Sequence, residues 1–479
     1  MKSLRPMQWV GAALGLGVAL YVLYTHLQYF GDLTLLGGVL LLEVLIISLW
    51  KYDERFFLLL MVAFLWAGMP IPLQTSWTAG RWVVLSAGAF VGYIAWMKAP
   101  RRSFGLIHLV AFSCVFTAFV SATVSQYVQM ASFKAVSLLL LFLYCSSGAR
   151  LAVLDREERF FNGLIVGAEI AVWASAVCYL VLSKRILGNP NSLGAVMSVG
   201  LFPLLLWGWL VSVGNVVRIR RLASLVLCTY LISASMARAG MLAALTVTVV
   251  LCFCLRQYRV LVKALAIVLL LVAVTGILDS RTLEKKAGDL TESLLNKGEK
   301  GAGALGSRRG PWETTIAAIN EHPLFGTGYG TSPTGQDPGL DFGKTSSSAE
   351  TAGEHGSSYL TITEWTGLLG VMPFAVLVVV TIVNILRICV WMRRTSEPRH
   401  CAIPLAMVVL AGLIHAGFED WLFAVGYYLC VYFWFCSFLL ADLVPENVTV
   451  PVANAVSPFP RSLPVDLGAN VPDPVAPNR

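Results

Sequence analysis

Long apolar stretches alternate with short polar clusters along almost the whole chain. Each stretch is long enough to cross about 30 Å of hydrocarbon as a helix, and each is followed by a cluster of Lys, Arg, Gly or Pro. The pattern predicts about fourteen membrane-spanning helices. About twelve is the alternative, because 56–70 is short and only a turn around Ala237 separates two neighbouring spans, which leaves a re-entrant hairpin open. The predicted spans are 8–28, 32–50, 56–70, 81–97, 104–123, 131–148, 159–183, 193–213, 222–236, 239–256, 260–278, 357–390, 402–417 and 421–442.

The composition supports a membrane protein rather than a soluble enzyme. Hydrophobic residues make up 57% of the 479 residues, charged residues make up only 13%, and the mean hydropathy is +0.73. Soluble domains carry about 25% charged residues, so this chain has too little polar material to cover a water-soluble globule. The expected fold class is therefore all-α, a polytopic integral membrane protein with about 12–14 transmembrane helices.

Lys and Arg residues gather in every second connection between the predicted spans. Because cationic residues in short loops stay on the cytoplasmic side, this alternation places both termini in the cytoplasm. The formal net charge of +8 then reflects membrane topology, and no nucleic-acid partner is expected. The connections predicted to face the outside are 29–31, 71–80, 124–130, 184–192, the turn at 237, 279–356 and 418–420.

The chain is predicted to have two parts. Residues 1–442 form the transmembrane domain, which includes the long external loop 279–356. Residues 443–479 are rich in Pro, Val, Asn and Ala, and we expect a disordered cytoplasmic tail there. The ten cysteines all lie in or beside the spans, so we expect them to be packing residues rather than disulfide partners or metal ligands.

The long loop predicted to be external carries most of the polar residues suited to catalysis or substrate binding. A short helix is predicted from Pro311 to Glu321, with Gly310 as its cap and an apolar stripe that indicates an interfacial helix. A Gly-rich turn, 323–330, and a Ser/Thr/Gly-rich stretch ending at His355 follow it. The chain has no nucleotide-binding signature and no zinc-ligand spacing, so the energy for any chemistry has to arrive with the substrate, and no cofactor or metal is expected.

Several short motifs in and around this loop occur in the order typical of one family. Together they resemble the central signature of the O-antigen ligase and O-antigen polymerase superfamily, and the ordering and the long external loop match over roughly residues 50–440. The pieces that carry the resemblance are Gly188-Asn189-Pro190-Asn191 with Gly194, Ser235 to Gly240, Ser307 to Trp312, His322 to Gly330, His355, Tyr359-Leu360, and Glu364 with Gly367.

The resemblance implies a metal-independent membrane glycosyltransferase with a GT-C-like fold, acting on the external face of the bacterial inner membrane. Its donor would be a glycan linked to a polyprenyl pyrophosphate such as undecaprenyl pyrophosphate. Carried over to this chain, Arg238 and Arg308 would bind the pyrophosphate, Arg309 would be a second cation, and His355 would activate the acceptor hydroxyl. These roles suit the residues, because guanidinium groups match phosphate oxygens bidentately and imidazole accepts protons near neutral pH.

Each of these residues also has a simpler interpretation. Arg238 is equally explained as a topology anchor between two helices, Arg308 and Arg309 as lipid-headgroup contacts, and His355 as an ordinary loop histidine. Two departures from the family pattern bear on the roles: two residues separate Ser235 from Arg238, and Gly356 follows His355 where the family commonly has Asn. A further candidate acceptor site is the group His415, Glu419 and Asp420 at an outer turn.

The acceptor is left open by the sequence. A ligase that transfers a finished glycan to a glycolipid is the preferred interpretation, and it would belong to lipopolysaccharide and cell-envelope biosynthesis. A polymerase acting on a growing glycan and a protein O-oligosaccharyltransferase share the same donor chemistry and remain alternatives. Outside this class, a polysaccharide transporter should show inverted repeats and charges near the membrane midplane, and the sequence has no convincing repeat. A non-catalytic membrane component would leave the external Arg and His residues unexplained.

Overall fold

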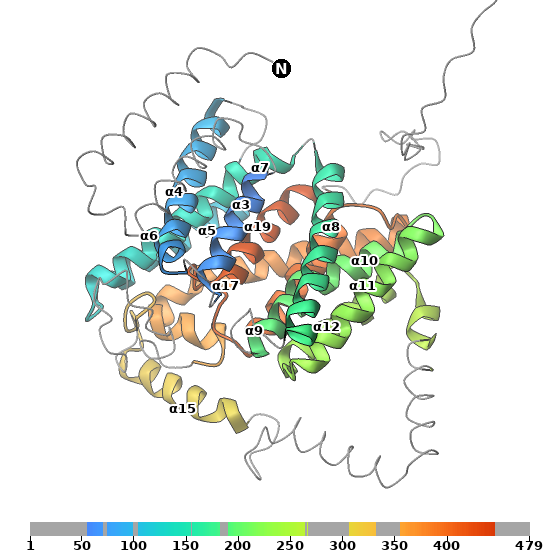
Figure 1. The fold of residues 1–479 in the computed structure, drawn as a ribbon. Helices are drawn as coiled ribbons and strands as arrows, with labels where there is room; N and C mark the ends of the chain where they lie inside the picture. The colour runs from blue at the N-terminus through green and yellow to red at the C-terminus, as the bar shows by residue number, and fades with distance from the viewer. Residues whose placement is uncertain are drawn as a thin grey trace, which may run out of the picture.

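The computed structural model describes residues 55–69, 74–98, 104–154, 156–182, 190–263, 266, 306–331 and 355–445. All regular elements within these ranges are helices, and these ranges contain no strand, which confirms the all-α prediction (Figure 1). The predicted spans 8–28 and 32–50, most of 260–278, and nearly all of the predicted tail 443–479 lie outside the described residues.

The helices follow the predicted apolar stretches closely. Five helical stretches in the described ranges are long and apolar enough to cross a membrane: Leu106–Thr123, Val128–Val153, Glu157–Val181, Pro190–Leu210 and Ser358–Thr395. The chain is therefore a multi-pass membrane protein. In chain order the elements are α3 (Arg55–Ala67), α4 (Gln74–Lys98), α5 (Leu106–Thr123), α6 (Val128–Ser146), α7 (Gly148–Val153), α8 (Glu157–Ala176), η2 (Val177–Val181), α9 (Pro190–Ala195), η3 (Val196–Leu201), α10 (Phe202–Leu210), α11 (Asn215–Ala234), α12 (Arg238–Cys254), α15 (Gly306–Glu321), α17 (Ser358–Thr395), α18 (Ala402–Ala416) and α19 (Tyr428–Leu443).

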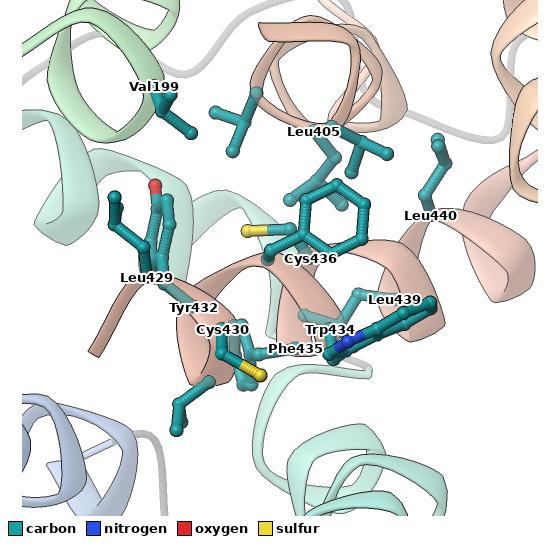
Figure 2. Packing of buried hydrophobic residues seen from close by; sticks show 14 of the residues in the cluster. Val199, Leu405, Leu429, Cys430, Tyr432, Trp434, Phe435, Cys436, Leu439 and Leu440 are labelled. Carbon is teal, nitrogen blue, oxygen red and sulfur yellow. The ribbon is translucent and has the colours of Figure 1, made fainter. Parts of the chain in front are cut away.

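The core of the bundle is built around α19. This helix is apolar on all sides and is buried from Tyr428 to Leu440, as expected for a helix enclosed by other helices. Its neighbours include α18, α6, α3 and α17. Figure 2 shows side chains of α19 packed against Val199 of η3 and Leu405 of α18. The position of α19 fixes the position of the segment just before it, 417–427, which carries site residues.

The connections between the described helices lie at two ends of the bundle. At the end that carries α15, which we call the α15 end, connections predicted to lie on one side of the membrane touch one another. Figure 1 shows α15 and α9 along the lower side of the molecule. The contacts at this end include Ser125 to Thr331 at 2.8 Å and Arg81 to the Gly426 carbonyl at 2.7 Å. At the opposite end, Trp207 of α10 donates to the Pro398 carbonyl at 2.8 Å, and Arg256, just after α12, donates to the Arg393 carbonyl of α17 at 3.0 Å.

Several boundaries differ from the sequence prediction, and α4 and α11 each begin seven residues earlier than expected, at Gln74 and Asn215. The helix expected to begin at Pro311 begins five residues earlier at Gly306, so Gly310 is not a cap and Pro311 lies inside α15. The span expected from residue 421 begins at Tyr428, because residues 417–427 form turns that are held by contacts to distant parts of the chain. The turn at 237 separates two helices, α11 with 20 residues and α12 with 17.

Candidate active site

The long helix α17 is broken near its start, and the Gly-rich turn 323–330 supplies new hydrogen bonds at the break. Gly367 has φ 67° and ψ 179°, which is not helical, so the backbone around it loses its helical hydrogen bonds. The Gly-rich turn supplies replacements: the Thr327 amide donates to the Glu364 carbonyl at 2.9 Å and the Gly328 amide to the Trp365 carbonyl at 3.1 Å. Two further hydrogen bonds run in the opposite direction, from the amides of Leu368 and Leu369 in α17 to the carbonyls of Pro323 and Leu324. Irregular backbone at membrane depth is tolerated where protein satisfies it in this way.

Glycine is required on both sides of this junction. A Cβ on Gly326 would lie 2.4 Å from the Glu364 carbonyl oxygen, and one on Gly367 would lie 2.3 Å from the Leu324 carbonyl oxygen. Both glycines also have positive φ, which other residues adopt only with strain. The loop and the broken helix therefore meet backbone to backbone, and the junction holds Glu364 in a fixed position.

The segment 417–427 is tied to the same junction. The amide and the hydroxyl of Ser358 both donate to the Glu419 carbonyl, at 3.0 and 2.6 Å, and the hydroxyl accepts from the Leu422 amide at 3.0 Å. Tyr329 of the Gly-rich turn is buried and donates its hydroxyl to the Phe423 carbonyl at 2.9 Å. These bonds bring the start of α17 and the segment 417–427 together, so residues far apart in sequence share one site.

His355 lies between two carboxylates at this meeting point. Its Nε2 is 3.0 Å from Glu364 Oε2 and its Nδ1 is 3.3 Å from Asp420 Oδ2. Burial by itself lowers the pKa of His355, but the hydrogen bonds to Asp420 and Glu364 and the charges of these two groups outweigh it and raise the pKa to about 9. Burial tends to raise the pKa of Asp420, and the hydrogen bond and charge of His355 reverse this and lower it. The arrangement favours an imidazolium ion between two carboxylate ions.

Arg308 of α15 lies beside this group. Its guanidinium is paired with the Glu419 carboxylate, and its side chain packs against Gly356, next to His355. Trp312, one turn further along α15, donates to the Gly356 carbonyl at 3.1 Å. The face of α15 on the bundle is therefore the one that carries Arg308 and Trp312, while Ile316 of the predicted apolar stripe is 46% exposed.

The structure does not bring Arg309 into the cluster. Its side chain is 81% exposed and pairs with Glu313 on the outer surface of α15, at 2.8 Å. The two arginines are adjacent in sequence, and successive residues on a helix point about 100° apart, so only one of them can face the bundle. Arg308 is the one that does.

The three residues of the candidate acceptor group are divided among different partners. Asp420 contacts His355, Glu419 contacts Arg308, and the buried His415 accepts a hydrogen bond from the Trp421 indole at 2.9 Å. The two carboxylates thus belong to the same cluster as the loop residues, while His415 packs at the end of α18 with Trp421.

Arg238 begins α12 at the same end of the bundle. The turn before it, 235–237, lies against α9, where a Cβ on Gly194 would come within 2.3 Å of Ala237 Cβ. Ser192 of α9 forms hydrogen bonds with Tyr427 and Tyr428, which connects this turn to the segment 417–427. The Asn-Pro-Asn segment and the turn that carries Arg238 are therefore packed together, and both connect to the segment that carries Asp420.

Sequence reasoning missed three charged residues that shape this end. Glu364 belongs to one of the family motifs and has no predicted role of its own, although an acidic residue inside an apolar span is a signal for function. Arg81 of α4 donates to the Gly426 carbonyl at 2.7 Å, and Lys134 of α6 donates to the Gly330 carbonyl. Both cations lie inside predicted spans and have no predicted role. In the structure they hold the loops that form the site.

The cluster combines the parts needed for a group transfer that expels an anion. Arg308 retains guanidinium N–H groups beyond the one that binds Glu419, and guanidinium groups bind phosphate oxygens well at a membrane boundary. The neighbouring carboxylates and imidazole provide sites that accept and hold a proton. The geometry therefore suits attack by a hydroxyl on a centre that carries a phosphate-type leaving group.

A known protein family matches part of the chain. Residues 223–375 match the family described as O-antigen ligase, and the matched segment runs from α11 through α15 to the junction in α17. The match confirms the predicted relationship to the O-antigen ligase and polymerase superfamily. A search of curated proteins found no significant match.

Proposed function

We propose that this chain, whose residues 223–375 belong to the O-antigen ligase family, is a metal-independent glycosyltransferase of the bacterial inner membrane. It takes a glycan from a polyprenyl pyrophosphate on the external face and transfers it to an acceptor hydroxyl, with a glycolipid acceptor preferred. The observation that carries the proposal is the position of Arg308 beside the buried His355 and Glu364 and the partly exposed Asp420.

Arg308 and Arg238 bind the pyrophosphate in this proposal. As the bond between sugar and phosphate breaks, negative charge gathers on the leaving pyrophosphate, and fixed cations at a site of low dielectric stabilise it without reorganising. Both residues lie at the α15 end of the bundle, where the family motifs converge. Arg309 is not assigned a role, because its side chain lies on the exposed face of α15.

The test is transfer by the purified protein in liposomes, with a polyprenyl-pyrophosphate-linked glycan as donor and a lipid A–core glycolipid as acceptor. Arg308→Ala and Arg238→Ala should each lower kcat/KM by about 10²–10³-fold, and Arg308→Lys should also be poor because ammonium cannot bind two oxygens in parallel. Arg309→Ala is the matched control and should stay near the wild-type rate, as should wild type treated with a chelator.

Two results would count against the proposal. Normal transfer by both the Arg308→Ala and Arg238→Ala proteins would remove the pyrophosphate-binding role from these residues. Loss of activity with a chelator, reversed by a divalent cation, would contradict the metal-independent scheme. Replacing the glycolipid with a growing glycan or a protein substrate in the same assay separates a ligase from a polymerase and from a protein-directed transferase.

A further inference from the structure

The hairpin formed by α10 and α11 carries two buried hydrogen-bond donors. The two helices pack side by side (Figure 1). Trp209 Nε1 of α10 and Arg221 Nε of α11 are both shielded from solvent, and neither has a hydrogen-bond partner among the residues that the structure describes. A buried N–H group without an acceptor destabilises the folded state. Both groups can only donate, so a group that satisfies them has to be an acceptor.

Two arginines of α11 lie against the end of α10. Arg221 Nη1 donates to the Gly208 carbonyl at 2.8 Å and to the Ser212 hydroxyl at 3.1 Å. The Arg218 guanidinium lies 5.8 Å from the centre of the Trp209 ring. Residues three apart share one face of a helix, so both arginines face α10. Guanidinium and indole donors therefore gather at one place between the two helices.

This group of donors has an excess of positive charge. The neighbouring Arg220 pairs with Glu169 of α8 at 3.1 Å, and Glu169 is the carboxylate that the described residues place against these arginines. One carboxylate against three guanidinium groups leaves the group net positive. Guanidinium groups stay charged and match two phosphate oxygens at once. A phosphate is therefore the acceptor that suits both the charge and the donors.

Exposed aliphatic side chains border the same donors. Val213, Val216 and Ile219 are 71%, 82% and 66% exposed. A soluble phosphate ion would leave these side chains in water, whereas the acyl chains of a phospholipid would cover them. Tryptophan and arginine beside aliphatic residues are typical of the boundary between the hydrocarbon and the head groups. The exposed side chains thus favour a lipid over a free anion.

We infer that Trp209, Arg218 and Arg221 form a binding site for the phosphate of an anionic phospholipid such as phosphatidylglycerol. The phosphate oxygens accept from Trp209 Nε1 and Arg221 Nε, and Arg218 supplies a further charge. The connection between α10 and α11 is one of the Lys- and Arg-rich connections that the charge pattern assigns to the cytoplasm. The site lies at the end of the bundle away from α15, so the inference goes beyond the proposed function and does not depend on it.

Native mass spectrometry of the full chain in detergent micelles tests the site by lipid titration. The wild type should bind its first phosphatidylglycerol at least about tenfold more tightly than phosphatidylcholine, whose choline cation the arginines repel. Arg218→Gln should raise the Kd for phosphatidylglycerol about tenfold, and Trp209→Phe, which keeps the ring but loses the N–H, about three- to tenfold. Arg259→Gln removes an exposed cation from the next basic connection and is the matched control, with an unchanged Kd.

The outcomes separate the possible occupants. Weaker binding in Arg218→Gln and Trp209→Phe but not in Arg259→Gln supports the site. Equal Kd values for Arg218→Gln and Arg259→Gln overturn it, as does equal affinity of the wild type for the two lipids. Inorganic phosphate at the lipid concentration should not displace phosphatidylglycerol, and displacement would identify a soluble anion as the occupant and overturn the lipid assignment. Melting temperatures without added lipid check folding, and if Trp209→Phe unfolds, the exposed Arg218→Gln decides.

Discussion

At the scale of single residues, the protonation of His355 decides how the site responds to pH. The charged groups that face it are Glu364 and Asp420, with the pair formed by Arg308 and Glu419 next to them. The two contacting carboxylates raise the pKa of His355 to about 9, against the opposing effect of burial. At neutral pH the histidine is therefore a cation that donates from both nitrogens.

The pH dependence of kcat follows from this charge. If protonated His355 holds Glu364 and Asp420 in place during transfer, kcat should be flat through neutral pH and fall as the pH rises through about 9. On the acid side, the lowered pKa of Asp420 should keep the enzyme active to a lower pH than an ordinary aspartate would. The measurement is kcat against pH in liposomes. A rate that rises through pH 9 would instead identify neutral His355 as the base.

At the scale of elements, the junction between the Gly-rich turn and α17 links the fold to the chemistry. The turn donates two backbone hydrogen bonds to the carbonyls of Glu364 and Trp365 at the point where α17 is broken at Gly367. The Glu364 side chain on this same residue reaches His355 at 3.0 Å. Any change that opens the junction should therefore move the site as well as weaken the helix.

Gly326→Ala tests this connection. A methyl group there would meet the Glu364 carbonyl oxygen at 2.4 Å at a residue with φ 74°, so we expect a loss of about 1–3 kcal/mol of stability and a large loss of transfer. Gly163→Ala is the control, since nothing lies within 4 Å of a Cβ at that position in α8. Thermal unfolding in detergent and transfer in liposomes measure the two effects. A Gly326→Ala protein with wild-type melting temperature and activity would contradict the role given to the junction.

At the scale of the whole molecule, a buried ion pair joins two helical segments at the end away from α15. Arg150 of α7 contacts Asp442 of α19 with two hydrogen bonds, 2.6 and 2.7 Å long, and lies 4.4 Å from the Trp96 ring. Arg150 lies beside one of the Lys- and Arg-rich connections that the charge pattern assigns to the cytoplasm. The structure adds that this arginine is 2% exposed and is part of the packing.

Removing one partner of this pair should destabilise the bundle strongly. Arg150→Ala leaves Asp442 charged and enclosed, which in buried pairs costs about 3–5 kcal/mol. Arg159 lies near the same connection but outside this ion pair. Arg159→Ala should therefore cost much less stability. Melting temperature in detergent is the measurement, and equal melting temperatures for the two variants would show that the pair does not hold the helices together.

The sidedness of the molecule is a prediction that labelling can check. Glu313 on α15 and Glu397 between α17 and α18 are both exposed and lie in connections assigned to opposite sides of the membrane. A membrane-impermeant thiol reagent applied to intact cells with a permeable outer membrane should label Glu313→Cys and leave Glu397→Cys unlabelled until the inner membrane is opened. The reverse pattern would place the site in the cytoplasm, and the unsubstituted protein is the background control.

The sequence by itself determined the helical stretches, the alternation of charge along the chain, and the Arg and His residues of the long loop as candidate site residues. These are local properties, because the length of an apolar stretch and the position of a cation can be read without knowing any partner. Only the tertiary structure decided which of them form a site. His355 meets Asp420 across 65 residues and Arg308 meets Glu419 across 111, and Arg309 is excluded by the rotation of one helix. Such pairings depend on how helices pack, and no periodicity in the sequence specifies them.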